Sequence, residues 1–150
     1  MQAATPAHLV EQLARGKCLA VSAQHPGAVV IGCDTVVDVN GEVFGKPHSE
    51  EDAKRMLRAL SGATHEVHTG VCISDGARTE SFVDSSRVTF FPLGEEEIDF
   101  YASTAVPYDK AGAYAFQGRA ALWLDRIEGD YYTIMGLPVS RTVQLLAHFV

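Results

Sequence analysis

The sequence has few basic residues, few cysteines and no long apolar run. Its 12 lysines and arginines are outnumbered by 19 aspartates and glutamates, which gives a formal net charge of −7. A protein that binds nucleic acid needs a basic face, so this balance argues against a nucleic-acid partner. No apolar stretch approaches the roughly 20 residues needed to cross a bilayer, so no membrane partner is expected.

Several familiar catalytic and metal-binding patterns are also absent. The three cysteines, Cys18, Cys33 and Cys72, are an odd number without metal-type spacing, as expected of reduced thiols in a cytoplasmic protein. His65 and His68 are expected on opposite faces of one strand, so they form no metal set. There is no Walker-type loop, G-x-G-x-x-G motif or Ser-His-Asp arrangement. A hydrolase with this sequence would therefore use metal-assisted attack by water rather than a covalent nucleophile.

What remains is the pattern of one globular domain. The chain has 150 residues, of which 47% are hydrophobic. Periodicity and turn signals predict helices over about 5–23, 49–61, 94–103 and 137–149, and strands over 28–32, 36–44, 65–74, 79–91 and 120–129. The 36–44 segment is read as a hairpin around Asn40-Gly41. Together these elements predict an α/β (mixed α+β) fold, a single domain over residues 1–150.

One carboxylate interrupts the apolar run "VVIGCDTVV", residues 29–37. Asp34 is expected just past a buried strand, followed by Thr35. An aspartate there can simply cap a turn. It can also bind a metal ion, or take the proton of a water molecule that attacks phosphorus. The residues alone leave both readings open.

Two lysines are predicted in constrained loops. Lys46 stands between Gly45 and Pro47 after the hairpin, where a fixed ammonium group suits a phosphate oxygen. Lys110 precedes a stretch of small residues at which backbone can approach a ligand closely. Either lysine can equally be a solvated turn residue or part of a surface ion pair.

Two further segments carry polar or aromatic side chains of interest. Gln117 ends the stretch "DKAGAYAFQG" and offers both an amide donor and an acceptor, as reading the edge of a base requires. The segment "GDYYTIMGLP", residues 129–138, is either an ordered loop packed over something or an aromatic core or subunit contact.

Taken in order, five segments resemble the Maf-like family of nucleotide pyrophosphatases: "GCDTVV", "GKP", "MLRALSGATHEVHTGV", "DKAGAYAFQG" and "IEGDYYTIMGLPV". The resemblance covers nearly the whole chain. It implies a twisted mixed sheet flanked by helices, a deep Maf/ITPase-like cleft, a homodimer, and a divalent cation, Mg²⁺ or Mn²⁺, as cofactor. It also implies a small-molecule nucleotide as the partner, and a house-cleaning hydrolase as the function.

The resemblance also assigns roles to particular residues. Asp34 would be the proton acceptor and a metal ligand, and Thr35 would take part in substrate choice. Lys46 and Lys110 would lie near the phosphates, and Gln117 at a position tied to base selection. The lysine and glutamine of "DKAGAYAFQG" are similar to the branch acting on dTTP and UTP. The branch acting on 7-methyl-GTP has a cysteine in place of this lysine and ends in Ser-Glu-Gly.

The sequence departs from the family pattern in one place. It contains no Ser-x-Ser-Pro-Arg-Arg loop, whose arginines would be natural clamps for phosphate. The chain is then either a fragment or short gene model, or a shortened homologue with weakened catalysis. The expected function is a nucleoside triphosphate pyrophosphatase acting on dTTP, UTP and modified pyrimidine nucleotides. The alternatives are a 7-methyl-GTP pyrophosphatase, or a non-catalytic nucleotide-binding protein tied to septum formation.

Overall fold

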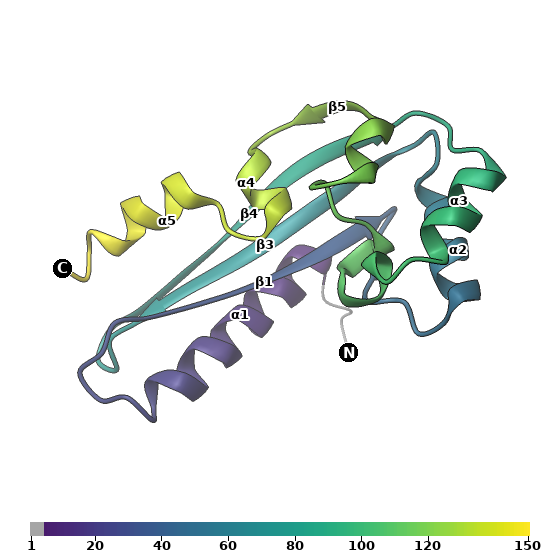
Figure 1. Ribbon diagram of the computed structural model, residues 1–150. Coiled ribbons are helices and arrows are strands. Elements are labelled where there is room, and N and C mark those ends of the chain that lie inside the picture. The colour runs from purple at the N-terminus through teal and green to yellow at the C-terminus, as the bar shows by residue number, and fades with distance from the viewer. Residues whose placement is uncertain (1–4) are drawn as a thin grey trace. The chain divides into compact units, whose positions relative to one another are not determined.

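A computed structural model describes residues 5–150 of the chain (Figure 1). Five strands form one sheet in the order β2-β1-β3-β4-β5. They are β1 (Val30–Val39), β2 (Glu42–Phe44), β3 (Thr64–Ser74), β4 (Thr79–Phe90) and β5 (Leu124–Glu128). The helices are α1 (Pro6–Ser22), α2 (Glu50–Leu60), α3 (Glu95–Ala102), α4 (Tyr131–Met135) and α5 (Val139–Leu146). The predicted α/β class, a sheet flanked by helices, is confirmed.

The described chain divides into two compact units. The first comprises residues 5–35, 68–85 and 130–150, and the second comprises 36–67 and 86–129. The expectation of one domain over residues 1–150 stays a prediction. Among residues 5–150, no helix combines the length and apolar character that crossing a membrane requires.

Two helices begin where the sequence predicts, because a hydroxyl residue caps each of them. The Thr5 side chain accepts a hydrogen bond from the backbone N–H of His8, directly before Pro6 opens α1. The Ser49 side chain accepts one from the N–H of Asp52 at the start of α2. Such caps satisfy N–H groups that have no partner within the helix.

The strand that carries Asp34 differs from its prediction. Two short runs, 28–32 and 36–39, were expected to be separate, but β1 is continuous over Val30–Val39. Asp34 therefore lies inside a strand rather than just past its end. The predicted turn at Asn40-Gly41 is confirmed: both residues have positive φ, 52° and 91°, and β2 pairs antiparallel with β1 beyond them. A strand can include a polar residue such as Asp34 when its backbone stays hydrogen-bonded to the neighbouring strands. Periodicity alone does not reveal this.

In the first unit, α1 lies directly against the backbone of β1 and β3 (Figure 1). A Cβ atom built on Gly32 of β1 would stand 2.8 Å from the Cβ atom of Cys18. One built on Gly70 of β3 would stand 2.6 Å from the carbonyl oxygen of Val10. The facing residues of the helix include the fully buried Ala14 and Cys18. Small residues on both sides thus permit contact that any larger side chain would prevent.

The second unit has an aromatic core around Phe90. The ring of Phe90 makes edge contacts with His65, Tyr114 and Trp123 at centroid distances of 5.1 to 5.8 Å. His65 shares a 2.6 Å hydrogen bond with the Tyr114 hydroxyl. Burial lowers the pKa of His65 to about 4 and raises the pKa of Tyr114. His65 is therefore a neutral core residue at pH 7, not a surface titrating group.

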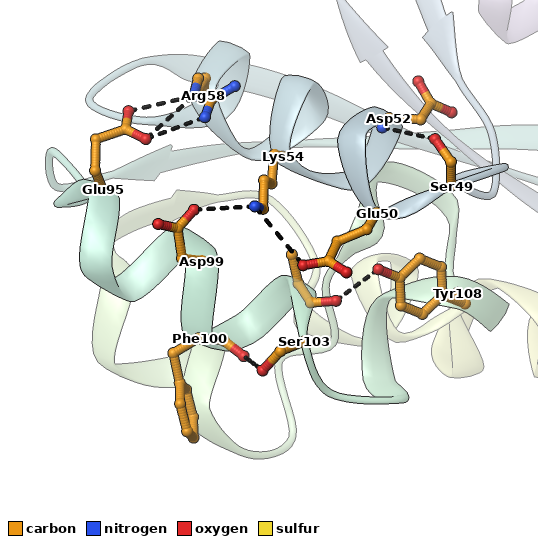
Figure 2. Close-up of polar contacts among 11 residues, drawn as sticks. Ser49, Glu50, Asp52, Lys54, Arg58, Glu95, Asp99, Phe100, Ser103 and Tyr108 are labelled. Carbon is orange, nitrogen blue, oxygen red and sulfur yellow. Dashed lines mark hydrogen bonds and ion pairs between the residues drawn. The ribbon is translucent and has the colours of Figure 1, made fainter.

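Helices α2 and α3 are joined by ion pairs between their facing sides, as Figure 2 shows. The ammonium group of Lys54 lies 3.3 Å from Asp99 of α3 and 3.7 Å from Glu50 on its own helix. One turn further on, Arg58 pairs with Glu95 at 3.1 Å. Exposed pairs contribute little individually, and these two link the facing sides of α2 and α3.

The final third of the chain departs most from the predicted elements. The expected strand over 120–129 begins with a 3-10 turn, η3 (Arg119–Trp123), before β5 pairs antiparallel with β4. Two further 3-10 turns, η1 (Val106–Asp109) and η2 (Ala111–Ala113), and the short helix α4 lie where loops were expected. The expected terminal helix is shorter, with Pro138 as its N-cap. Segments this short carry too few residues to show a period.

The contact between α1 and the sheet predicts opposite effects for two glycine substitutions. Gly70→Ala should lower the free energy of unfolding by about 1–3 kcal/mol or more, because the new methyl group meets helix backbone. Gly16→Ala, within α1 and with nothing within 4 Å of the added Cβ atom, should raise it by up to about 1 kcal/mol through helix propensity. Thermal melts of both variants check this, since about 1 kcal/mol shifts Tm by roughly 2–4 °C at this size. Equal changes in the two variants would contradict the packing.

Candidate functional site

The carboxylate of Asp34 is held on both of its oxygens within the first unit. Its Oδ1 accepts a 2.9 Å hydrogen bond from the backbone N–H of Thr35. Its Oδ2 lies 3.5 Å from the ammonium group of Lys17 on α1. The side chain of Asp34 is 24% exposed, so it is oriented by the protein and still reachable from solvent. A carboxylate in this setting can accept a proton or bind a cation.

Lys17 is the residue of this site that the sequence analysis did not single out. It precedes Cys18, which packs against Gly32, so the helix backbone passes close to β1 at this level. That approach lets the Lys17 side chain, itself 60% exposed, reach Asp34 two residues after Gly32. The available signal was the pair of small residues Ala14 and Cys18 at helical spacing. Nothing in the sequence indicated which strand they would face.

The thiol of Cys33 lies beside the same pair of charges. Burial raises its pKa, Asp34 raises it further, and Lys17 opposes both. The thiol is therefore held in its protonated, weakly nucleophilic form at neutral pH. Cys18, Cys33 and Cys72 are all free thiols, as expected.

Thr35 begins a chain of hydrogen bonds that reaches the "GDYYTIMGLP" segment. Its hydroxyl lies 2.8 Å from that of Thr69 on β3, which in turn donates at 2.8 Å to the backbone carbonyl of Thr133 on α4. The side chain of Thr133 donates to Asp84 on β4, and Arg141 of α5 donates to the other oxygen of Asp84 at 2.7 Å. The segment is an ordered element, and with Tyr131 and Tyr132 exposed it is not an aromatic core. Its expectation as a subunit contact stays a prediction.

The two predicted lysines of the second unit are brought near each other. The carbonyl of Gly45, next to Lys46, accepts a 3.1 Å hydrogen bond from the N–H of Gly112 in η2, two residues after Lys110. The Lys110 ammonium lies 3.1 Å from Asp109. The pKa of Asp109 is lowered, chiefly by its hydrogen bond with Lys110 and to a lesser extent by Lys46. Both lysines are exposed, so their ammonium groups are accessible to an anion.

Gly112 explains why the small-residue stretch takes this position. Its φ is 73°, in the left-handed region, and an added Cβ atom would stand 2.7 Å from the side chain of Val37 on β1. The loop therefore lies flat on its own unit's strand, where only glycine fits. Gln117, further along the same loop, is exposed beside Gly118, and its part in reading a base stays a prediction.

The side chains present suit one kind of metal site better than another. Within the described range, 5–150, no three or more His, Cys, Asp or Glu residues gather closely enough to enclose an ion. A structural zinc site needs such a set, whereas Mg²⁺ is commonly held by one or two carboxylates together with substrate phosphates and water. Asp34 supplies one accessible carboxylate and therefore fits the Mg²⁺ type of site.

Comparison with known proteins agrees with these features. A family model described as "Maf-like protein" matches residues 1–149. The chain is similar to a dTTP/UTP pyrophosphatase of Bacillus velezensis, 49% identical over 97% of this chain and 77% of the relative. One of Symbiobacterium thermophilum is also 49% identical, over 99% of this chain and 77% of the relative, and one of Bacillus mycoides is 46% identical over 97% and 76%. Because the family match and these relatives extend over nearly its whole length, the chain belongs to the Maf-like family.

Proposed function

We propose that the chain is a nucleoside triphosphate pyrophosphatase that converts dTTP and UTP to the monophosphate and pyrophosphate. The observation that carries the proposal is the doubly held, accessible carboxylate of Asp34. The substrate class comes from the relatives named dTTP/UTP pyrophosphatase, which are 43–49% identical. Modified pyrimidine nucleotides are included because a base pocket that accepts both thymine and uracil tolerates a change at the ring carbon where they differ.

In the proposed reaction, water attacks the α-phosphorus and Asp34 accepts its proton. The backbone N–H of Thr35 and the ammonium group of Lys17 orient the carboxylate, so that one lone pair is directed to the water. Lys46 and Lys110 bind phosphate oxygens and offset the negative charge of the triphosphate. Pyrophosphate leaves with the electron pair of the broken P–O bond.

A divalent cation, Mg²⁺ or Mn²⁺, is part of the proposal. When bound, it supplies Lewis-acid stabilisation of the phosphate oxygens. Asp34 would be its protein ligand, and the remaining positions would be filled by substrate oxygens and water. The homodimer that the family resemblance implies also stays part of this proposal, and so does a location in the cytoplasm.

Replacing Asp34 tests the central assignment. Asp34→Asn keeps the volume and still accepts the Thr35 N–H, but its amide cannot take a proton at neutral pH. We expect kcat to fall about 10²–10⁴-fold, the usual contribution of a positioned base. Pyrophosphate release from dTTP and UTP measures it. The matched control is Asp125→Asn, an exposed aspartate on β5, which should keep parental turnover. Activity of Asp34→Asn within about threefold of the parent would exclude Asp34 as the base.

Replacing the two loop lysines tests phosphate binding. Lys46→Ala and Lys110→Ala should each raise KM for the triphosphate, and the parent should depend on salt more strongly than either variant, because a charge-assisted contact is lost. Lys54 is unsuitable as a control, since its side chain is only 18% exposed and it links α2 to α3 through Asp99. Arg126→Ala serves instead: this cation lies on β5, its side chain is 65% exposed, and its ion-pair partner Glu128 is on the same strand. An equal rise in KM for Arg126→Ala would show that the loop lysines have no special role.

Replacing Gln117 tests base selection. Gln117→Ala should narrow the preference for dTTP and UTP over purine triphosphates more than it weakens binding of the triphosphate portion, because only base contacts are lost. Kinetics with dTTP, UTP, CTP, ATP and GTP on parent and variant check it. Equal use of all five by the parent would contradict the assignment, and a preference for 7-methyl-GTP would identify the other branch of the family. Binding without pyrophosphate release would indicate a non-catalytic nucleotide-binding protein.

A further inference from the structure

The hydroxyl of Thr69 has two partners, and together they determine the direction of its hydrogen bonds. It lies 2.8 Å from the carbonyl oxygen of Thr133 and 2.8 Å from the hydroxyl of Thr35. A carbonyl can only accept, and a hydroxyl carries a single hydrogen. Thr69 therefore donates to Thr133, and its contact with Thr35 requires Thr35 to be the donor.

This direction decides what Thr35 can offer to a ligand. Its hydrogen is committed to Thr69, so only its oxygen lone pairs remain for another partner. Thr69 is fully buried, and a buried hydroxyl without partners costs about 1–3 kcal/mol, so the arrangement resists reversal. Thr35 is half-buried and adjoins Asp34, which makes it the accessible end of the chain.

Gly136, at the end of α4, lies next to this accessible end of the chain of hydrogen bonds. A Cβ atom built on Gly136 would stand 3.7 Å from the Oγ1 of Thr35, an ordinary van der Waals distance. Gly136 itself has a φ of 121°, and its N–H donates to the carbonyls of Tyr132 and Thr133. Helix α4 therefore supplies the carbonyl that orients Thr69, and its C-cap, Gly136, has no side chain to place beside Thr35.

We propose that Thr69 is a positioning residue that makes Thr35 an obligate hydrogen-bond acceptor toward the bound nucleotide. This inference rests on the proposed function. Thr35 then selects nucleotides that present a donor to it, either the N3–H of uracil and thymine or a hydroxyl of the sugar. Cytosine has an acceptor at N3, so selection through the base disfavours CTP, whereas selection through the 3′-hydroxyl of the sugar, which dTTP and UTP share, disfavours 2′,3′-dideoxy nucleotides.

Thr133 provides a matched control that shows whether the role of Thr69 is purely structural. The side chain of Thr133 is also fully buried and belongs to the same chain of hydrogen bonds, but its hydroxyl donates to Asp84. Thr133→Val removes that hydroxyl and leaves the Thr133 carbonyl, Thr69 and Thr35 in place. A loss of stability is expected in both Thr69→Val and Thr133→Val, but a change of specificity only in the first.

The experiment compares the parent with Thr69→Val, Thr69→Ser and Thr133→Val, each as the full chain. One arm measures kcat/KM for UTP, CTP and N3-methyl-UTP, and the other for UTP, dUTP and 2′,3′-dideoxy-UTP. Calorimetric binding of the α,β-imido analogues of the same nucleotides gives a readout that needs no turnover. Thermal melts record stability separately.

If Thr35 accepts from the base, the kcat/KM of the parent for UTP should exceed that for CTP and N3-methyl-UTP by about tenfold or more. If it accepts from the sugar, the same excess should appear over the nucleotide that lacks the sugar hydroxyl. One hydrogen bond at a partly buried site allows a preference of this size. Thr69→Val should reduce this preference to about threefold or less, because the freed Thr35 hydroxyl can rotate and donate instead. Thr69→Ser should keep the parental preference. Thr133→Val should keep it too, even if its Tm falls.

Three results would overturn the inference: no discrimination by the parent in either arm, an unchanged preference in Thr69→Val, or an equal narrowing in Thr133→Val. Binding of the analogues together with no release of pyrophosphate from UTP or dTTP would overturn the proposed catalysis alone, and the binding ratios would still decide on Thr69. Failure of every analogue to bind would overturn both.

Discussion

The first unit depends on the close approach of α1 to the backbone of β1 and β3. Gly32 and Gly70 have no room for a side chain, since an added Cβ atom would stand 2.8 Å from Cys18 or 2.6 Å from Val10. This contact brings Lys17 to Asp34 and turns a carboxylate inside a strand into a charge-balanced, oriented group. A bulkier residue at either glycine would move the helix outward and take the ammonium group away from its partner.

Several further polar contacts of the first unit orient groups around that pair. The Thr35 N–H orients one oxygen of Asp34, and the Thr35 hydroxyl is oriented in turn by Thr69. The carbonyl of Thr133 on α4 is the acceptor for Thr69, so a segment distant in sequence determines the hydrogen-bond direction of a side chain next to the carboxylate. Buried hydroxyls are costly without partners, and this keeps the chain of hydrogen bonds in one arrangement.

The second unit also contains a close backbone contact, in the loop that includes Gly112. Gly112 lies against Val37 and donates to the carbonyl of Gly45, so the loops that carry Lys46 and Lys110 support each other. The ammonium groups of the two lysines remain exposed, and both lower the pKa of Asp109. The aromatic core centred on Phe90 fills the interior of the unit, and neither Lys46 nor Lys110 takes part in the ion pairs between α2 and α3.

Caps, turn residues and periodicity determined much of the fold from the sequence alone, because Thr5, Ser49 and Asn40-Gly41 act on their immediate neighbours. The same local signals singled out Asp34 as a lone carboxylate in an apolar run. Only the tertiary structure decided that β1 continues through Asp34, that Lys17 is its partner, and that Thr35 must donate to Thr69. These depend on which helix face meets which strand and on where a single hydrogen is committed. Such pairings between residues far apart in the chain leave no period or spacing in the sequence.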